Sequence, residues 1–145
     1  MSTATSDQHC SDRRISVARW EPPADAELLG ELLSKLRSWQ PLDGEAVLDD
    51  IAAALDDMTP DEAEIAELVQ RLCGHLARLT AIAVAAKADQ RDAPTAALVQ
   101  RGRVLRSVDV AGDRAVATHH LRRIGWVTNE LMEALVAAKC LKEAA

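Results

Sequence analysis

Apolar residues in this chain recur at steps of three and four, and this spacing restricts the fold more than any other feature of the sequence. It runs through residues 24–39, residues 45–58 and the long stretch that follows Thr59. Such spacing places apolar side chains on one face of an α-helix. Phe and Tyr are absent while Ala and Leu are abundant, which favours helix and leaves little to build strands with. The sequence therefore predicts an all-α fold.

Start and stop signals divide the chain into five expected helices. The first two occupy residues 24–39 and 45–58. A long third helix is expected to begin after Thr59 as N-cap, with Pro60 in the first helical position and Glu62 completing a capping box. Its apolar face comprises Ile65, Leu68, Leu72, Leu76, Leu79, Ala83 and Ala86.

Two further helices are expected after the polar segment of residues 88–94. Asp92 or Thr95 opens the fourth, in which Gly102 permits close approach of a neighbouring helix. Its inward face is expected to carry Ala97, Leu98, Leu105 and Val108. The fifth spans about residues 113–142, with an apolar stripe of Val116, His120, Ile124, Val127, Leu131, Leu135 and Ala138. Short connections between such helices predict an antiparallel up-and-down bundle of four to five helices.

The polar N-terminal segment and the cysteines predict the domain organisation and the location. Residues 1–20 are expected to form a disordered arm, and residues 21–145 a single helical bundle domain. No apolar run approaches the roughly 20 residues of a membrane span, and no secretory leader is recognisable. The three cysteines are widely spaced, which is typical of reduced thiols. We therefore expect a cytoplasmic protein with no membrane partner.

Charge is distributed unevenly along the chain. Between Glu21 and Glu67 there are fourteen acidic residues against two basic ones, whereas between Arg91 and Arg123 there are seven basic against three acidic. One interpretation is that the oppositely charged helices pair inside the bundle. The other is that a basic surface stays exposed for a protein partner or a second copy of the chain. The net charge of −6 and the lack of interleaved aromatic residues argue against nucleic acid as the partner.

Motifs for catalysis and metal binding are missing from the sequence. No Gly-rich phosphate loop or G-x-S-x-G is present, and no histidine follows a glutamate by three residues. His119 and His120 point about 100° apart on a helix, so they do not form a chelating pair. The aspartates of residues 49–57 are interpreted as a solvated face. We therefore expect no catalytic residue, no metal and no cofactor.

Six residues are the candidates for binding. His119, Arg122 or Arg123, and Trp126 share a helix face beside the apolar stripe. Trp and Arg are the residue types enriched at interface hot spots, and the alternative interpretation is that Trp126 covers the edge of the bundle. His120 lies in the stripe itself, where it could meet His75 across the core.

The second half of the chain also resembles a known family. The stretches "ELVQRLCGHLARL", "AALVQRGRVLRS" and "HHLRRIGWVTNELMEAL" are similar to small helical actinobacterial proteins annotated in genomes as "family natural product biosynthesis protein". Gly74 and His75 match its Gly-His element, residues 103–105 match its Ala-Arg-x-x-Leu helix with Gly102 in place of the alanine, and His119 or His120 with Arg123 matches its final helix. The resemblance covers residues 60–137 and implies an accessory or regulatory role, with no catalytic residues to transfer. It departs at Trp126, where the family usually has a small residue.

These observations lead to two functional hypotheses. The first is a non-enzymatic accessory or regulatory module that associates with a protein partner or with itself, with the link to natural product biosynthesis that the resemblance implies. The second is a small-molecule binding protein or minor enzyme whose pocket lies between the long helices. The residues assigned to these roles are His75, His119, His120, Arg122, Arg123 and Trp126.

Overall fold

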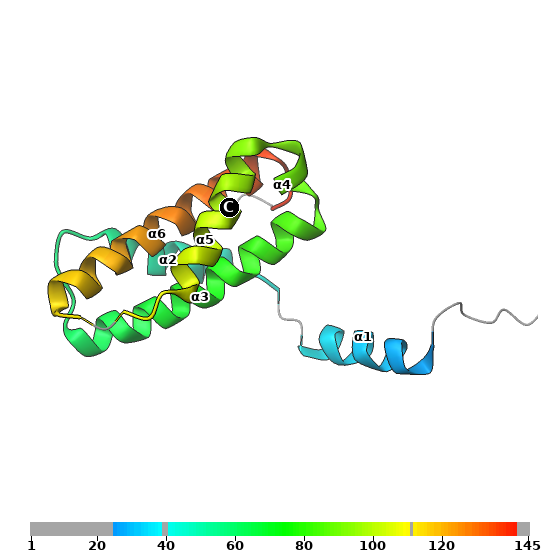
Figure 1. Ribbon diagram of the computed structural model, residues 1–145, viewed down its shortest axis with the longest axis horizontal. Helices are drawn as coiled ribbons and strands as arrows, with labels where there is room; N and C mark the ends of the chain where they lie inside the picture. Colours follow the sequence, from blue (N-terminus) through cyan, green and yellow to red (C-terminus); the bar gives the residue numbers. More distant parts are fainter. Residues whose placement is uncertain (1–24, 39–40, 111, 142–145) are drawn as a thin grey trace, which may run out of the picture. The chain divides into compact units, whose positions relative to one another are not determined.

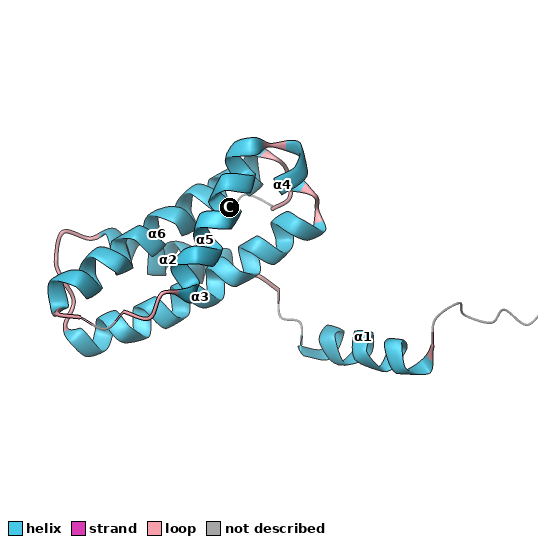
Figure 2. Ribbon diagram, in the orientation of Figure 1, coloured by secondary structure: helices cyan, strands magenta, loops and turns pink. Residues whose placement is uncertain are grey.

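The computed structural model describes residues 25–38, 41–110 and 112–141, and within them it contains six helices and no strand (Figures 1 and 2). The all-α prediction is confirmed. The chain divides into two compact units, one that ends at Gln40 and one that begins at Pro41. The expected domain organisation, with a single bundle over residues 21–145, stays a prediction. The arm expected at residues 1–20 lies outside the described residues.

Helix α1 (Ala26–Ser38) belongs to the first unit and confirms the expected first helix. Its leucines recur on one face, and this apolar face is exposed. The leucine side chains concerned are Leu28, Leu29, Leu32, Leu33 and Leu36, with exposed fractions between 37% and 67%. An amphipathic helix of this kind normally buries its apolar stripe, whereas the leucines of α1 are exposed.

Helices α2 (Gly44–Leu55) and α3 (Glu62–Ala85) open the second unit, each behind an aspartate N-cap. The cap of α3 is Asp61 and not Thr59, so the expected start was wrong by two residues. The Asp61 carboxylate accepts from the Glu64 backbone N–H at 2.8 Å, and the Glu64 side chain accepts from the Asp61 N–H at 3.1 Å. This capping box has the same three-residue spacing as the one expected, so the sequence pattern did not distinguish the two registers.

The remaining helices are α4 (Ala88–Arg91), α5 (Ala93–Ser107) and α6 (Arg114–Ala137). The single turn of α4 was not expected, and it follows Lys87, whose φ of 56° ends α3. Asp92 caps α5, which confirms one of the two predicted starts. Asp113 caps α6, but α6 ends at Ala137 and not near residue 142.

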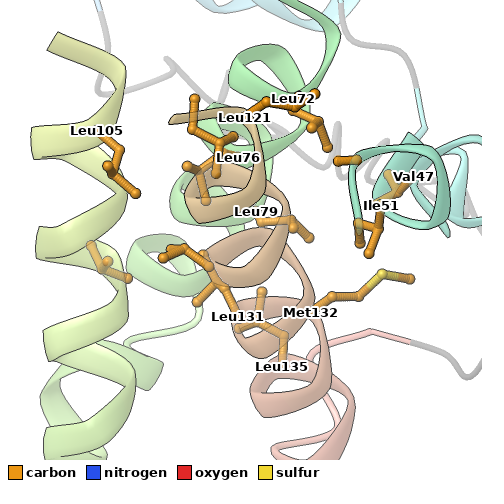
Figure 3. Close-up of a cluster of buried hydrophobic side chains, with 14 of the residues drawn as sticks. Val47, Ile51, Leu72, Leu76, Leu79, Leu105, Leu121, Leu131, Met132 and Leu135 are labelled. Atoms are coloured by element: carbon orange, nitrogen blue, oxygen red, sulfur yellow. The ribbon is translucent and has the colours of Figure 1, made fainter. Parts of the chain in front are cut away.

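Helix α6 is the centre of the second unit, because it packs against α2, α3 and α5. In Figure 1 the consecutive helices α2, α3, α5 and α6 alternate in direction, so α3 and α6 start at the same end. Figure 3 shows leucines of α3, α5 and α6 pointing toward one another, with Val47 and Ile51 of α2 reaching in from one side. The core therefore lies along the axis between α3 and α6.

The buried faces agree with the predicted stripes in α3 and in the middle of α6, and differ at the helix ends. In α6, Val116 is 52% exposed, and the buried face is wider than a stripe because three helices surround it. Ala97 of α5 and Val108, which follows the last residue of α5, are exposed, and the buried residues of α5 are Thr95, Val99, Gly102 and Leu105. Thr95 can be buried because its hydroxyl donates to the Asp92 carboxylate.

Two buried glycines allow the helices to approach closely. A Cβ on Gly102 of α5 would lie 3.2 Å from the Leu76 side chain of α3, which agrees with the expected close approach at that residue. A Cβ on Gly125 of α6 would lie only 2.9 Å from the Cβ of Ala54 in α2. The second contact was not expected, and it sets the distance between α2 and α6.

None of the helices in the described part of the chain is long and apolar enough to cross a membrane.

Candidate functional site

A basic hollow surrounds Trp126 on the outer side of α6. It has a volume of ≈ 420 Å³ and is lined by Leu55, Arg101, His119, Arg122, Arg123, Trp126 and Val127. We refer to these residues as the Trp126 surface. Trp126 itself is 46% exposed, which is unusual for a large aromatic side chain in the middle of a long helix. The surface therefore combines a partly exposed indole with three guanidinium groups.

Three helices position this surface. Helix α6 carries His119, Arg122 and Trp126 at steps of three and four, so their side chains share one face, as the sequence predicted. Helix α5 adds Arg101, whose guanidinium carbon lies 5.8 Å from the centre of the Trp126 ring, within the range of a cation–π contact. Leu55 comes from the last turn of α2, which the close contact at Gly125 holds against α6.

A second hollow continues along α6 toward its N-terminus. It has a volume of ≈ 560 Å³, and it shares His119 and Arg122 with the Trp126 surface. Arg114, also in its lining, donates to the backbone carbonyls of Pro60 at 2.7 Å and of Thr59 at 3.1 Å. These bonds explain why α3 starts after Pro60, since the two carbonyls stay outside the helix and accept from α6 instead. The arginine thus has a structural role that the sequence did not reveal.

Among the residues that the structure describes, no carboxylate forms an ion pair with the arginines of the Trp126 surface. Within the described ranges, the ion pairs are those of Asp50 with Arg71 and with His75, and both join α2 to α3. No described ion pair joins the acid-rich helices to Arg101, Arg122 or Arg123, and the lining of this hollow contains no acidic side chain. The pairing interpretation of the charge asymmetry therefore finds no support at this surface.

His75 lies in a different place from the one expected. Its Nε2 is 2.8 Å from an Asp50 carboxylate oxygen, and Arg71 Nε donates to the same carboxylate at 3.1 Å. The Asp50 side chain is only 14% exposed, so the interpretation of this aspartate as part of a solvated face was wrong. The Asp50–His75–Arg71 cluster links α2 to α3, and a structural role accounts for all of its contacts.

His120 is buried, with an exposed fraction of 7%, and it faces a third cavity between α3, α6 and the connection from α5 to α6. Burial lowers the pKa of His120 below its ordinary value of 6.5, and the positive charge of Arg123 and then His119 lowers it further. The cavity does not include His75. The predicted meeting of His75 and His120 across the core is therefore wrong, because the side chain of His75 turns to Asp50 in α2.

The sequence reasoning missed two residues that complete these sites. Arg101 could not be assigned to the Trp126 surface because its place depends on how α5 packs against α6. Asp50 carried no signal beyond its position in a run of aspartates. Among the residues that the structure describes, no three His, Cys, Asp or Glu side chains gather closely enough to hold a metal ion.

The comparison with protein-family models finds one match, to a family of unknown function termed DUF6415, over residues 45–140. No curated protein and no solved structure shows a significant match to the chain. The matched range includes α2 from its second residue and all of α3 to α6, and hence all the described residues in the lining of the Trp126 surface. Since it covers about two thirds of the sequence, the chain belongs to the DUF6415 family of unknown function.

Proposed function

We propose that this protein is a non-enzymatic binding module whose Trp126 surface binds an acidic segment of a protein partner. The observation that carries this proposal is the hollow itself, in which a half-exposed tryptophan lies beside three arginines, with no carboxylate among the described lining residues. Trp and Arg are the residue types that contribute most to binding energy at protein interfaces. The setting that we propose, an accessory role in natural product biosynthesis, comes from the sequence resemblance alone.

Neighbouring apolar side chains support a protein partner over a small anion. Leu55 is 41% exposed in the lining, and Met58 is 79% exposed just beyond the end of α2. A simple anion would use the guanidinium groups and gain nothing from these side chains. A helix or loop that carries both carboxylates and an apolar anchor would use both.

The acidic segment can be tested with a defined peptide. The probe is a labelled amphipathic peptide with leucines on one face and glutamates on the other, and its control has every glutamate replaced by glutamine. We expect saturable binding of the acidic peptide only, weakening as salt increases, because the attraction is between partly exposed charges. Fluorescence anisotropy measures the dissociation constant.

Matched variants locate the binding surface. Arg122→Glu and Trp126→Ala are each expected to raise the dissociation constant of the acidic peptide by about tenfold or more. Arg103→Glu makes the same charge change on an exposed position of α5 outside the hollow, and it is expected to have a smaller effect. Equal binding of the glutamine peptide, or equal loss in Arg103→Glu, would refute the proposal.

A second copy of the chain is the other partner that the Trp126 surface can bind. Light scattering on the full chain decides whether the partner is a second copy. A dimer that Arg122→Glu and Trp126→Ala convert to monomer would assign the Trp126 surface to self-association. A monomer that both variants leave unchanged, together with no peptide binding, would remove the proposed function altogether.

A further inference from the structure

The cavity next to His120 is separate from the Trp126 surface and has the features of a small-molecule site. Its volume is ≈ 290 Å³, close to the lower end of the range of about 300–1,000 Å³ that is typical of ligand pockets. The first half of α3 forms one wall, α6 another, and residues 108–110 and 112 the third. The lining residues are Glu62, Ile65, Ala66, Val69, Cys73, Val108, Asp109, Val110, Gly112, Ala117 and His120.

His120 is the histidine in the described lining of this cavity. The side chain is more than nine-tenths buried, and across residues 25–38, 41–110 and 112–141 its ring forms no hydrogen bond. Its ring nitrogens are not among the buried side-chain atoms without a partner, so they are accessible from the cavity, where a water molecule or a ligand can bind them. The imidazole therefore marks the point at which a ligand would be held.

The rest of the lining indicates what kind of molecule fits. Most of it is apolar, with Ile65, Val69, Val108 and Val110 among the wall residues. The ionised groups in the lining are the carboxylates of Glu62 and Asp109, which would repel an anion. Arg106 lies close enough to Cys73 to affect its titration, and Arg123 does the same to His120, but neither lines the cavity.

Cys73 does not make this cavity a catalytic site. Burial raises the pKa of the Cys73 thiol above its ordinary value of 9.0, and the nearby Arg106 only partly opposes this effect. The thiolate is the reactive form of cysteine, so a buried neutral thiol acts as a small apolar wall residue. Non-covalent binding is the chemistry that the lining supports.

We propose that the His120 cavity binds a small, uncharged, mainly apolar molecule that carries one hydroxyl or N–H group, as phenols and indoles do. The apolar body would lie between α3 and the connection from α5 to α6, and the polar group would form a hydrogen bond with the His120 ring. This site is independent of the Trp126 surface, so either proposal can fail without the other.

Phenol, toluene and benzoate provide matched probes, because they share one ring and differ in a single substituent. NMR titration of the full wild-type chain follows the methyl signals of Ile65 and Val69 and the ring signals of His120. We expect saturable shifts at these residues with phenol, weaker shifts with toluene, and none with benzoate. The phenol-to-toluene preference should be roughly five- to tenfold, the contribution of one hydrogen bond.

The variant that tests the hydrogen bond is His120→Leu, which replaces the imidazole with an apolar side chain of similar size. We expect it to lose the preference for phenol over toluene while still binding both. His75→Leu makes the same replacement in a histidine outside the cavity and should keep the preference. If His120→Leu does not fold, the comparison of phenol, toluene and benzoate on the wild-type chain still tests the proposal. Shifts that cluster at Trp126, tighter binding of benzoate than of phenol, or no saturable shift with phenol would overturn the proposal.

Discussion

His120 and His75 show how two histidines of the same bundle acquire different roles from their surroundings. His75 lies between Asp50 and solvent with a side chain 22% exposed, and the carboxylate is its partner. His120 lies among apolar residues with cationic side chains nearby, so its charged form is disfavoured. The positions of the two residues in the sequence did not indicate this difference, since both fall on or beside an apolar stripe.

The lowered pKa of His120 predicts a pH-dependent stability. Because the unfolded chain binds this proton at a higher pH than the folded chain does, stability should fall as the pH drops below about 6.5, and His120 should contribute no pH dependence well above it. The groups around the ring are Arg123 and His119 on α6, with Glu62, Cys73 and Asp109 in the cavity. Thermal unfolding between about pH 7 and about pH 5 measures the effect.

The matched variant for this prediction is His120→Gln, which keeps a polar side chain but does not titrate. Its melting temperature should fall less than that of the wild type over the same pH interval. Carboxylates elsewhere titrate equally in both proteins and cancel in the comparison. If the melting temperatures of the two proteins depend on pH in the same way, the pKa of His120 is not lowered in the folded chain.

At the scale of single helices, the start of α3 was misplaced because two capping boxes overlap. Thr59 with Glu62 and Asp61 with Glu64 have the same spacing, and both follow the pattern of residue types. The tertiary contact of Arg114 with the Thr59 and Pro60 carbonyls favours the second register, because it needs those carbonyls free. Local sequence predicted that a capped helix starts here, and the packing of α6 decided at which residue.

The assignment of the cap is testable by substitution. Asp61→Ala should lower the free energy of unfolding by about 1 kcal/mol, the usual cost of removing an N-cap side chain. Thr59→Ala should change it by less than about 0.5 kcal/mol, because its side chain caps nothing. Urea denaturation measures the free energy of unfolding of both variants. A larger loss of stability in Thr59→Ala than in Asp61→Ala would show that Thr59 caps α3.

The glycines of the bundle give a prediction about the distance between helices. Gly125→Ala should destabilise the protein by roughly 1–2 kcal/mol, because the added methyl meets Ala54 and this overpacking outweighs the gain in helix propensity. Gly74→Ala should instead stabilise it by up to about 1 kcal/mol, since nothing lies within 4 Å of the new methyl.

A double variant tests whether the contact between the two helices is the cause. Combining Gly125→Ala with Ala54→Gly moves the methyl from α2 to α6 and restores the volume at the interface. The pair should therefore be more stable than the sum of the two single effects. Strict additivity would show that the backbone of α6, and not the approach of α2, explains the loss.

At the scale of the whole molecule, the hydrophobic core belongs to the second unit. Every buried hydrophobic side chain of the described residues lies between Val47 and Leu135, and the leucines of α1 are exposed. A chain that begins at Pro41 should therefore keep its melting temperature within about 4 °C, the shift that about 1 kcal/mol produces in a domain of roughly this size. Calorimetry checks this, and a larger drop would show that the first unit covers part of the bundle.

The sequence alone determined that the chain is helical, roughly where its helices lie, and most of the buried stripe in α3 and in the middle of α6, because these properties depend on periodicity and composition along a single helix. It also indicated that His119, Arg122 and Trp126 share a face, since the steps between them are helical. Only the tertiary structure decided which helices meet. Three features arise between segments far apart in the chain: the partner of His75, the place of Arg101 above Trp126 and the cavity at His120. A single sequence does not indicate which distant segments come into contact.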